Sequence, residues 1–261
     1  MNTMMRRAIH VIALCVLMSP WAGPAALAAD RETSPKEAAV QNVKLGMAYL
    51  QSGQYQDAKD KLERALKQDP DNFQVHMGLA LLWAQLDKPA EAEKAYKKAM
   101  RVSPDNPDVI NAYAVFLCNN GKPDEALSQF DNVLKNKLYR TPWVVATNAA
   151  VCLRSVKRNE KAVAYLERAI SLREDFADAV IQMADVQLAL GKGAQSRQVI
   201  DRFLALPRKS ADLLLIGVRA ALADGDRAAA DSYARLLRRD FPTAPQTLAL
   251  PQILQGNPQA K

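Results

Sequence analysis

Residues 39–72 read AVQNVKLGMAYLQSGQYQDAKDKLERALKQDPDN, and a similar frame returns at residues 73–106. Small residues stand at matching places in the two stretches: Gly46 and Ala58, then Ala80 and Ala92. Larger residues stand beside them, namely Tyr49, Leu62, Trp83 and Tyr96. Small side chains let two helix backbones approach closely, and the larger ones fill the space next to that contact. The 34-residue period therefore predicts a packed helix pair in each repeat, ended by Pro70 and Pro104 because proline lacks a backbone donor.

This spacing resembles the tetratricopeptide repeat (TPR), whose units of about 34 residues each form a helix, a turn and a second helix. Such units stack into a solenoid in which each repeat contacts mainly its neighbours. The resemblance implies an all-α fold, a right-handed superhelical solenoid of about six TPR repeats. A solenoid of this kind offers a binding groove and no built-in catalytic centre, so we expect a protein that is not an enzyme.

Six helix-pair units are expected, at 39–72, 73–106, 107–140, 143–176, 177–210 and 211–244. The third unit ends in an irregular joint, Lys137-Leu138-Tyr139-Arg140-Thr141-Pro142. The fifth is degenerate, because Ser196 stands where the other repeats have alanine. Outside the solenoid at 39–244, residues 29–38 are expected to form a short leader and residues 245–261 a poorly ordered tail.

The N-terminus has the pattern of an export signal. Arg6 and Arg7 precede an apolar run at residues 8–18, and small residues follow at 25–29. A charged start, an apolar centre and an A-x-A site define a secretory signal peptide. The apolar run is shorter than the roughly 20 residues that a membrane span needs. We therefore predict that residues 1–28 are a cleaved signal peptide of a bacterium; the alternative is an uncleaved anchor.

The charge balance is mildly basic. The chain has 35 basic and 28 acidic residues, and removal of residues 1–28 leaves a net charge of about +5. No arginine-rich arm or alternation of basic and aromatic residues indicates nucleic-acid binding. We interpret the charges as solvated outer faces of helices.

Two cysteines remain after Cys15 is removed with the signal. Cys118 and Cys152 each stand late in the first helix of their repeats, the third and the fourth, and these helices are neighbours in a solenoid. An oxidising compartment favours a disulfide between them. A bridge across about 34 residues should contribute roughly 3–4 kcal/mol in the chain-entropy model. The alternative is a pair of buried free thiols.

Residues for a catalytic or metal site are scarce. The chain beyond the signal has one histidine, His76, which we expect to be an ordinary surface or groove residue. One histidine with two bridged cysteines leaves no zinc-ligand set. Carboxylates such as Glu63 and Glu91 stand near lysines on helical faces, as ion-pair partners do. We predict no catalytic residues, no metal and no cofactor.

The binding site is expected on the inner surface, formed by fixed positions of each first helix. In the first three repeats these positions are mainly apolar, with a few amides. They are Val43, Met47, Leu50, Met77, Leu81, Gln85, Asn111, Val115 and Asn119. Apolar positions that include adaptable methionines suit a segment of a partner protein. Alternatively, the leader or tail of the chain covers some of them. Farther along, Asp178, Asp185 and Asp212 make the inner surface more acidic.

Several stretches together resemble one family, the type IV pilus biogenesis and stability proteins PilF and PilW, which act as secretin pilotins. The first helix, Asn42-Val43-Lys44-Leu45-Gly46-Met47-Ala48-Tyr49-Leu50, is similar to the first helix of that family. So are residues 111–118, which end at Cys118, and residues 210–217. The irregular joint and Cys152 after it are the most specific part of the resemblance.

The resemblance implies a periplasmic protein that binds subunits of the outer-membrane secretin and supports their localisation and multimer assembly for pili. Members of the family are usually lipoproteins. Here the only candidate for acylation, Cys15, follows Leu14, which is too large for a lipobox. We therefore expect a soluble periplasmic protein, or one held at the outer membrane by its partner. The alternatives are a general periplasmic TPR adaptor for cell-envelope assembly and an assembly factor for a redox enzyme.

Overall fold

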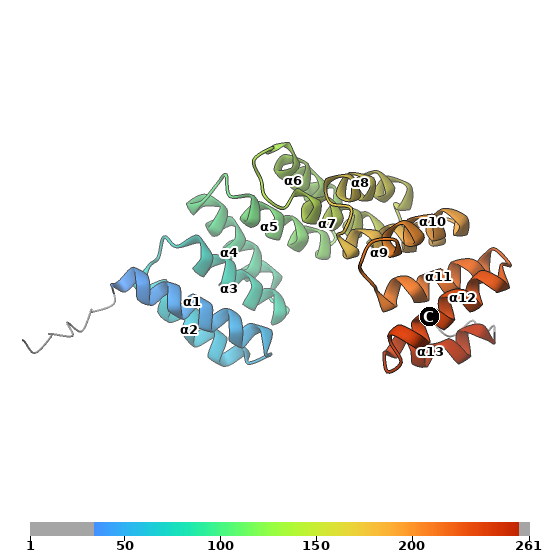
Figure 1. The fold of residues 1–261 in the computed structure, drawn as a ribbon. Helices are drawn as coiled ribbons and strands as arrows, with labels where there is room; N and C mark the ends of the chain where they lie inside the picture. The colour runs from blue at the N-terminus through green and yellow to red at the C-terminus, as the bar shows by residue number, and fades with distance from the viewer. Residues whose placement is uncertain (1–33, 256–261) are drawn as a thin grey trace, which may run out of the picture. The chain divides into compact units, whose positions relative to one another are not determined.

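A computed structural model describes residues 34–255, which form thirteen helices and no strand (Figure 1). The first six helices are α1 Pro35–Gln51, α2 Tyr55–Gln68, α3 Phe73–Gln85, α4 Pro89–Val102, α5 Pro107–Asn119 and α6 Pro123–Lys135. The others are α7 Pro142–Ser155, α8 Asn159–Leu172, α9 Ala177–Ala189, α10 Gly193–Leu204, α11 Ala211–Ala223, α12 Arg227–Asp240 and α13 Pro245–Leu254. The predicted all-α class is confirmed.

Helices pair as the small residues require. Each odd-numbered helix from α1 to α11 packs against the next even-numbered one. In the first pair, a Cβ atom added to Gly46 would lie 2.8 Å from Cγ of Leu62 and 3.3 Å from the carbonyl oxygen of Ala58. Both Leu62 and Ala58 are fully buried. Only glycine permits this approach of α1 to α2, because any larger side chain would push the helices apart.

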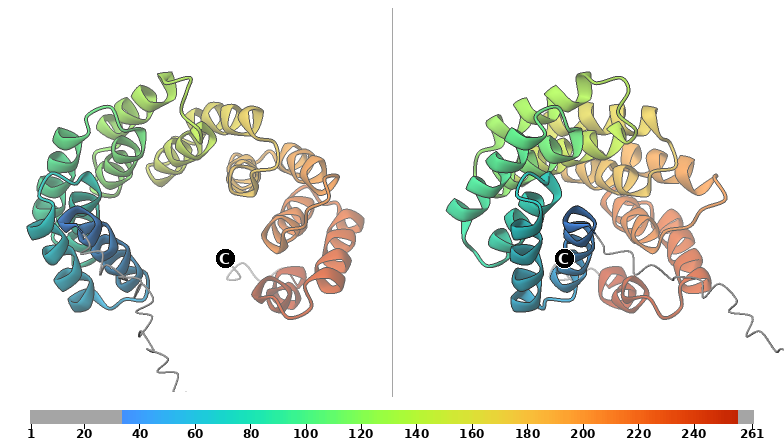
Figure 2. Two further views of the ribbon diagram at one scale, coloured as in Figure 1. Left: turned by 60° about the vertical axis from the view of Figure 1, so that its left-hand side comes forward. Right: turned by 90° about the vertical axis from the view of Figure 1, so that its left-hand side faces the viewer.

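The pairs stack in chain order, as the views in Figure 2 show. Each even-numbered helix from α2 to α10 packs against the first helix of the next pair. Each odd-numbered helix also packs against the next odd-numbered helix. In the described part of the chain, α3 and α5 are the exception, because these two helices do not pack closely against each other. The odd-numbered helices therefore form a shared surface that is interrupted between α3 and α5.

The turn inside each of the six pairs has one residue with a left-handed backbone. These residues are Gly53, Asp87, Gly121, Lys157, Gly191 and Gly225. Glycine adopts this conformation without a steric penalty, which explains why it stands at four of the six turns. Successive residues are 34 positions apart, except that 36 positions separate Gly121 from Lys157. The structure thus locates an insertion of two residues between the third and fourth pairs, at the irregular joint expected from the sequence.

Side-chain contacts and a disulfide hold this joint. The hydroxyl of Tyr139 donates to Oδ1 of Asp108 across 2.7 Å, and the guanidinium of Arg168 on α8 donates to the carbonyl oxygen of Leu134 on α6 across 2.7 Å. Cys118 on α5 and Cys152 on α7 are bridged, with their Cα atoms 5.7 Å apart. The bridge expected from the sequence is therefore present, and it joins two neighbouring first helices directly beside the insertion.

The ends of the array differ from the sequence prediction. Helix α1 begins at Pro35, so it includes four residues that were assigned to the leader. The prediction of a poorly ordered tail is wrong for the first ten residues of that segment, because Pro245–Leu254 forms α13. Leu250 and Ile253 are buried against α11 and α12, and this apolar contact orders the helix although its sequence is too short to show a clear period. The predicted signal peptide and residues 256–261 lie outside the described residues.

His76 is buried, which contradicts its expected place at the surface or in the groove. Only 6% of its surface is exposed, and its Nε2 lies 2.7 Å from the carbonyl oxygen of Pro70. The ring thus links the start of α3 to the loop after α2. Burial lowers the pKa of His76, although the Pro70 carbonyl partly opposes this effect. The neutral ring is the form that fits the fold.

We expect acidification to destabilise the protein through His76. An unfolded histidine titrates near 6.5, and the pKa in the folded state lies below that value. The unfolded state therefore binds more protons as the pH falls below about 6.5, so stability is complete above this pH and declines below it. Urea unfolding at pH 7.5 and pH 5.5 should show the loss, and His76→Gln should reduce it. An equal loss in the variant would assign the pH dependence to carboxylates.

Candidate functional site

A cavity of about 320 Å³ lies between α3 and α5, where the surface of the odd-numbered helices is interrupted. We call it the α3–α5 cavity. Its lining includes four residues predicted for the binding groove: Leu81, Gln85, Val115 and Asn119. Leu81 and Val115 come from facing helices, so the repeat places them opposite each other at positions 34 residues apart. The volume lies within the range of roughly 300–1,000 Å³ that is typical of ligand pockets.

Aromatic side chains explain why α3 and α5 stand apart here. Tyr96 of α4 packs against Phe116 of α5 with ring centres 5.1 Å apart, and against Tyr113 at 5.8 Å. All three rings are buried. Their bulk fills the space beneath the two first helices and prevents closer approach, because packed rings cannot be compressed. Tyr96 and Phe116 also line the α3–α5 cavity.

The cavity has an apolar part and a polar end. Leu81, Val115 and Phe116 supply the apolar part, while the amides of Gln85 and Asn119 lie toward the helix ends. Burial raises the pKa of Tyr96 to about 12, so its hydroxyl stays protonated and able to donate a hydrogen bond. Such a site can take one or two apolar side chains of a protein segment and bind the adjacent peptide groups through amides.

The other predicted groove residues have different roles. Val43 is only 7% exposed and lies in the core formed by the first three helices, so its assignment to the binding surface was wrong. It faces the core because α1 packs against α3 as well as α2. Met47, Leu50 and Met77 are partly buried and pack against the core. Asn111 is engaged within the protein, because its Oδ1 accepts a hydrogen bond of 3.1 Å from Asn148 of α7.

Two of the acidic residues expected farther along the inner surface, Asp185 and Asp212, contact side chains of a neighbouring first helix. Arg154 of α7 forms an ion pair of 3.4 Å with Asp185 and a hydrogen bond to Gln182, both on α9. Asp212 of α11 accepts a hydrogen bond of 2.7 Å from Gln246 of α13. These contacts link successive first helices, so they serve the stacking of the array.

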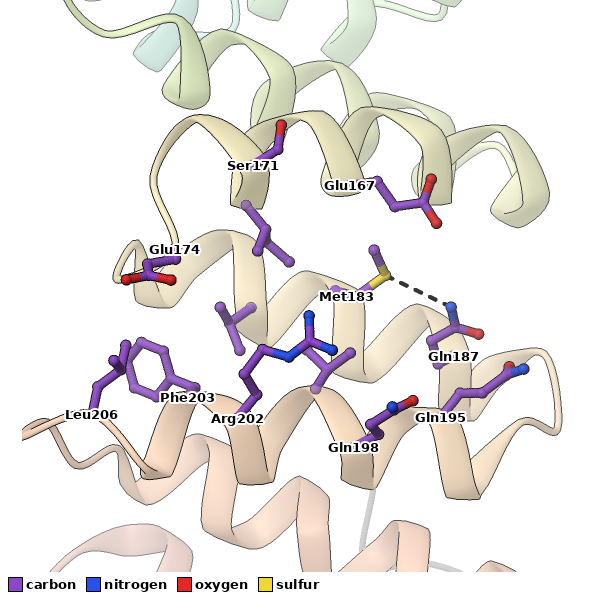
Figure 3. Close-up of a pocket in the computed structure, with 13 residues that line it drawn as sticks. Glu167, Ser171, Glu174, Met183, Gln187, Gln195, Gln198, Arg202, Phe203 and Leu206 are labelled. Carbon is purple, nitrogen blue, oxygen red and sulfur yellow. Dashed lines mark hydrogen bonds between the residues drawn. The ribbon is translucent and has the colours of Figure 1, made fainter.

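A second cavity, of about 450 Å³, lies between α8 and α10 and is lined by α9 as well (Figure 3). We call it the α8–α10 cavity. Sequence analysis missed it, although the degenerate fifth repeat was a signal. Gln187 stands where earlier repeats have Tyr49, Trp83, Leu117 and Leu153. The amide replaces a bulky apolar residue, and it lines the cavity.

The described residues form neither a metal site nor a membrane-spanning helix. Within residues 34–255, no group of three or more His, Cys, Asp or Glu side chains is placed to hold a metal ion. No helix in the same part of the chain is long and apolar enough to cross a membrane.

Comparison with family models shows tetratricopeptide repeats at residues 43–107, 84–137 and 145–176. The type IV pilus assembly protein PilF of Pseudomonas aeruginosa is 30% identical over 200 residues, which are 77% of this chain and 79% of that protein. The chain belongs to the PilF family of type IV pilus TPR proteins. The resemblance noted in the sequence is thereby confirmed.

Solved structures of the PilF family share the fold. The crystal structure of PilW, described as a widely conserved type IV pilus biogenesis factor, superposes with a TM-score of 0.67 at 26% identity. The match covers 81% of this chain and 97% of PilW. The structure of Pseudomonas aeruginosa PilF gives a TM-score of 0.65 at 28% identity and covers 84% of this chain and 99% of that one. Nearly the whole of each relative therefore corresponds to this TPR array.

Proposed function

We propose that this protein is a non-catalytic TPR protein of type IV pilus biogenesis that binds secretin subunits in the periplasm and supports their localisation and multimer assembly at the outer membrane. Membership of the PilF family carries this proposal. The α3–α5 cavity supplies a site of suitable chemistry, because its apolar part and its amides fit a protein segment. No step in this function requires a reacting group.

Two features support a periplasmic location. The N-terminal sequence has the pattern of a cleaved export signal. In addition, Cys118 and Cys152 are bridged, and structural disulfides persist in oxidising compartments such as the periplasm. The absence of a lipobox at Cys15 favours a soluble protein, or one held at the outer membrane through the secretin.

Deletion of the gene tests the proposal. We expect an immunoblot to show loss of heat-stable secretin multimers and accumulation of secretin monomers, together with loss of twitching motility. A plasmid copy of the gene should restore both. Unchanged multimers and normal motility in the deletion strain would contradict the proposed function. They would favour a general periplasmic adaptor, whose deletion should alter the cell envelope instead.

A further inference from the structure

The α8–α10 cavity has an apolar floor that residues 34–255 leave uncovered. Ile170 of α8, Met183 of α9 and Val199 of α10 converge there, and Phe203 closes one end. Met183 and Phe203 belong to two different core clusters, which meet at α9. The cavity thus marks the place where side chains of the fourth and fifth pairs do not fill the space between helices.

The rim carries charges that no ion pair within residues 34–255 neutralises. Figure 3 shows Glu167 on α8 and Glu174 on the loop after it, with Arg202 across the cavity on α10. Among the described residues, none of the three forms an ion pair, although Arg173 and Arg208 nearby both pair with Asp175. One side of the cavity is therefore acidic, and the opposite side carries a guanidinium that has no ion pair in the described part of the chain.

Gln187 adds an unpaired buried atom. Its Nε2 lies 3.7 Å from the sulfur of Met183 (Figure 3), but its Oε1 is buried and has no hydrogen-bond partner among residues 34–255. A buried oxygen without a donor is unfavourable by about 1–3 kcal/mol, so such atoms are rare in folded proteins. A bound group with an N–H or O–H donor would satisfy it.

A second hollow adjoins the α8–α10 cavity. This hollow, of about 720 Å³, shares Ile170, Glu174 and Arg202 with the cavity and extends along Pro207 and Arg208. Together they make a track between α8 and α10 that is longer than one side chain. An elongated occupant fits this track better than a compact small molecule.

We propose that the α8–α10 cavity is a second docking site, which takes an amphipathic helix of a partner protein. The apolar face of that helix packs on Ile170, Met183 and Val199. A lysine or arginine on one flank pairs with Glu167 and Glu174, and an acidic residue on the other flank pairs with Arg202. A helix suits the site because anchors at positions i, i+3, i+4 and i+7 follow one line along a groove between two helices.

A designed peptide tests this site without the secretin. The probe is a fluorescein-labelled peptide of roughly 14 residues, about four helical turns, with leucines on one face, lysines on one flank and glutamates on the other. In the comparison peptide every lysine is replaced by glutamate. The chain is basic overall, so attraction by net charge alone would favour the comparison peptide. We expect the reverse order by fluorescence anisotropy.

Two kinds of variant locate the binding. Glu167→Lys with Glu174→Lys reverses the acidic rim at exposed positions, and Val199→Trp fills the cavity. Each should weaken binding of the lysine-containing peptide at least tenfold. Glu160→Lys with Glu125→Lys is the matched control, since both residues are exposed and lie outside the cavity. In the wild-type protein the methyl NMR signals of Met183 and Val199 should shift on binding.

Three results would overturn the proposal: equal binding to the wild-type and charge-reversed proteins, equal or stronger binding of the all-glutamate peptide, or no binding of either peptide. Dimerisation of the wild-type protein that Val199→Trp abolishes would also overturn it, because the occupant would then be a second copy of the chain. None of these measurements involves the secretin, so the docking site and the proposed pilus function can fail independently.

Discussion

Replacement of both Cys118 and Cys152 with alanine is expected to lower the free energy of unfolding by about 4 kcal/mol. The two cysteines are 34 residues apart, and the chain-entropy model assigns about this value to a closed loop of that length. Cross-linking limits the conformations open to the unfolded chain, and its removal restores them. Folded proteins are only marginally stable, so this loss is a large fraction of the total free energy of unfolding.

Because of the position of the bridge, its removal should also lower the local stability of the joint between the third and fourth pairs. It joins α5 to α7 across the two-residue insertion between Gly121 and Lys157. Each repeat of a solenoid is stabilised mainly by its neighbours, so a weakened joint lets the two sides open separately. We therefore expect faster amide hydrogen exchange in α6 and α7 of the double variant.

Urea unfolding with and without reductant measures the effect. The wild-type protein should lose stability when reduced, whereas the double alanine variant should be insensitive to reductant. Cys118→Ala alone is the control for the change of side chain. If the oxidised wild type and the double variant unfold at the same urea concentration, the bridge does not stabilise the joint.

Glutamates in the α3–α5 cavity should weaken binding of the secretin's purified periplasmic region at least about 100-fold. The variant is Leu81→Glu with Val115→Glu, which places two carboxylates on facing helices in the apolar part of the cavity. A partner that buries its apolar side chains there would have to desolvate both charges, which is strongly unfavourable. Both positions are partly exposed in the free protein, so we expect the fold to survive.

The control adds the same charge elsewhere. Ala90→Glu with Ser128→Glu changes two exposed residues outside the cavity, on α4 and α6. Calorimetric titration should show binding by the control and none by the cavity variant, while circular dichroism shows equal helix content in both. Retained binding by the cavity variant would move the secretin site to another surface, without affecting membership of the PilF family.

Periodic features were predictable because each repeat specifies its own helices. Glycine and alanine at matching positions show where backbones touch, as Gly46 against Leu62 and Ala58 demonstrates. The cysteine pair was predictable for the same reason: Cys118 and Cys152 stand at nearly equivalent places in neighbouring first helices. Leu81 and Val115 share one repeat position, so their placement side by side in one cavity was also predictable, whereas their role in binding stays a prediction.

Features that depend on departures from the repeat needed the structure. No feature of the sequence within one repeat indicates that Tyr96 and Phe116 hold α3 and α5 apart, because the contact between these rings joins different repeats. His76 and Val43 occupy positions that suggested exposure, but their neighbours bury them. Helix α13 is ordered by α11 and α12 rather than by its own short sequence.

A repeat sequence thus determines the helix pairs, their order and the places where backbones meet, since these depend on residues within one unit and its copy. The cavities depend on how closely unlike side chains from three or four helices pack. Gln187 illustrates the difference: its sequence position shows that a bulky residue is missing, but only the arrangement of α8, α9 and α10 shows that the space remains open. The volume left open between helices depends on the side chains of several neighbouring repeats together, so the sequence of one repeat does not determine it.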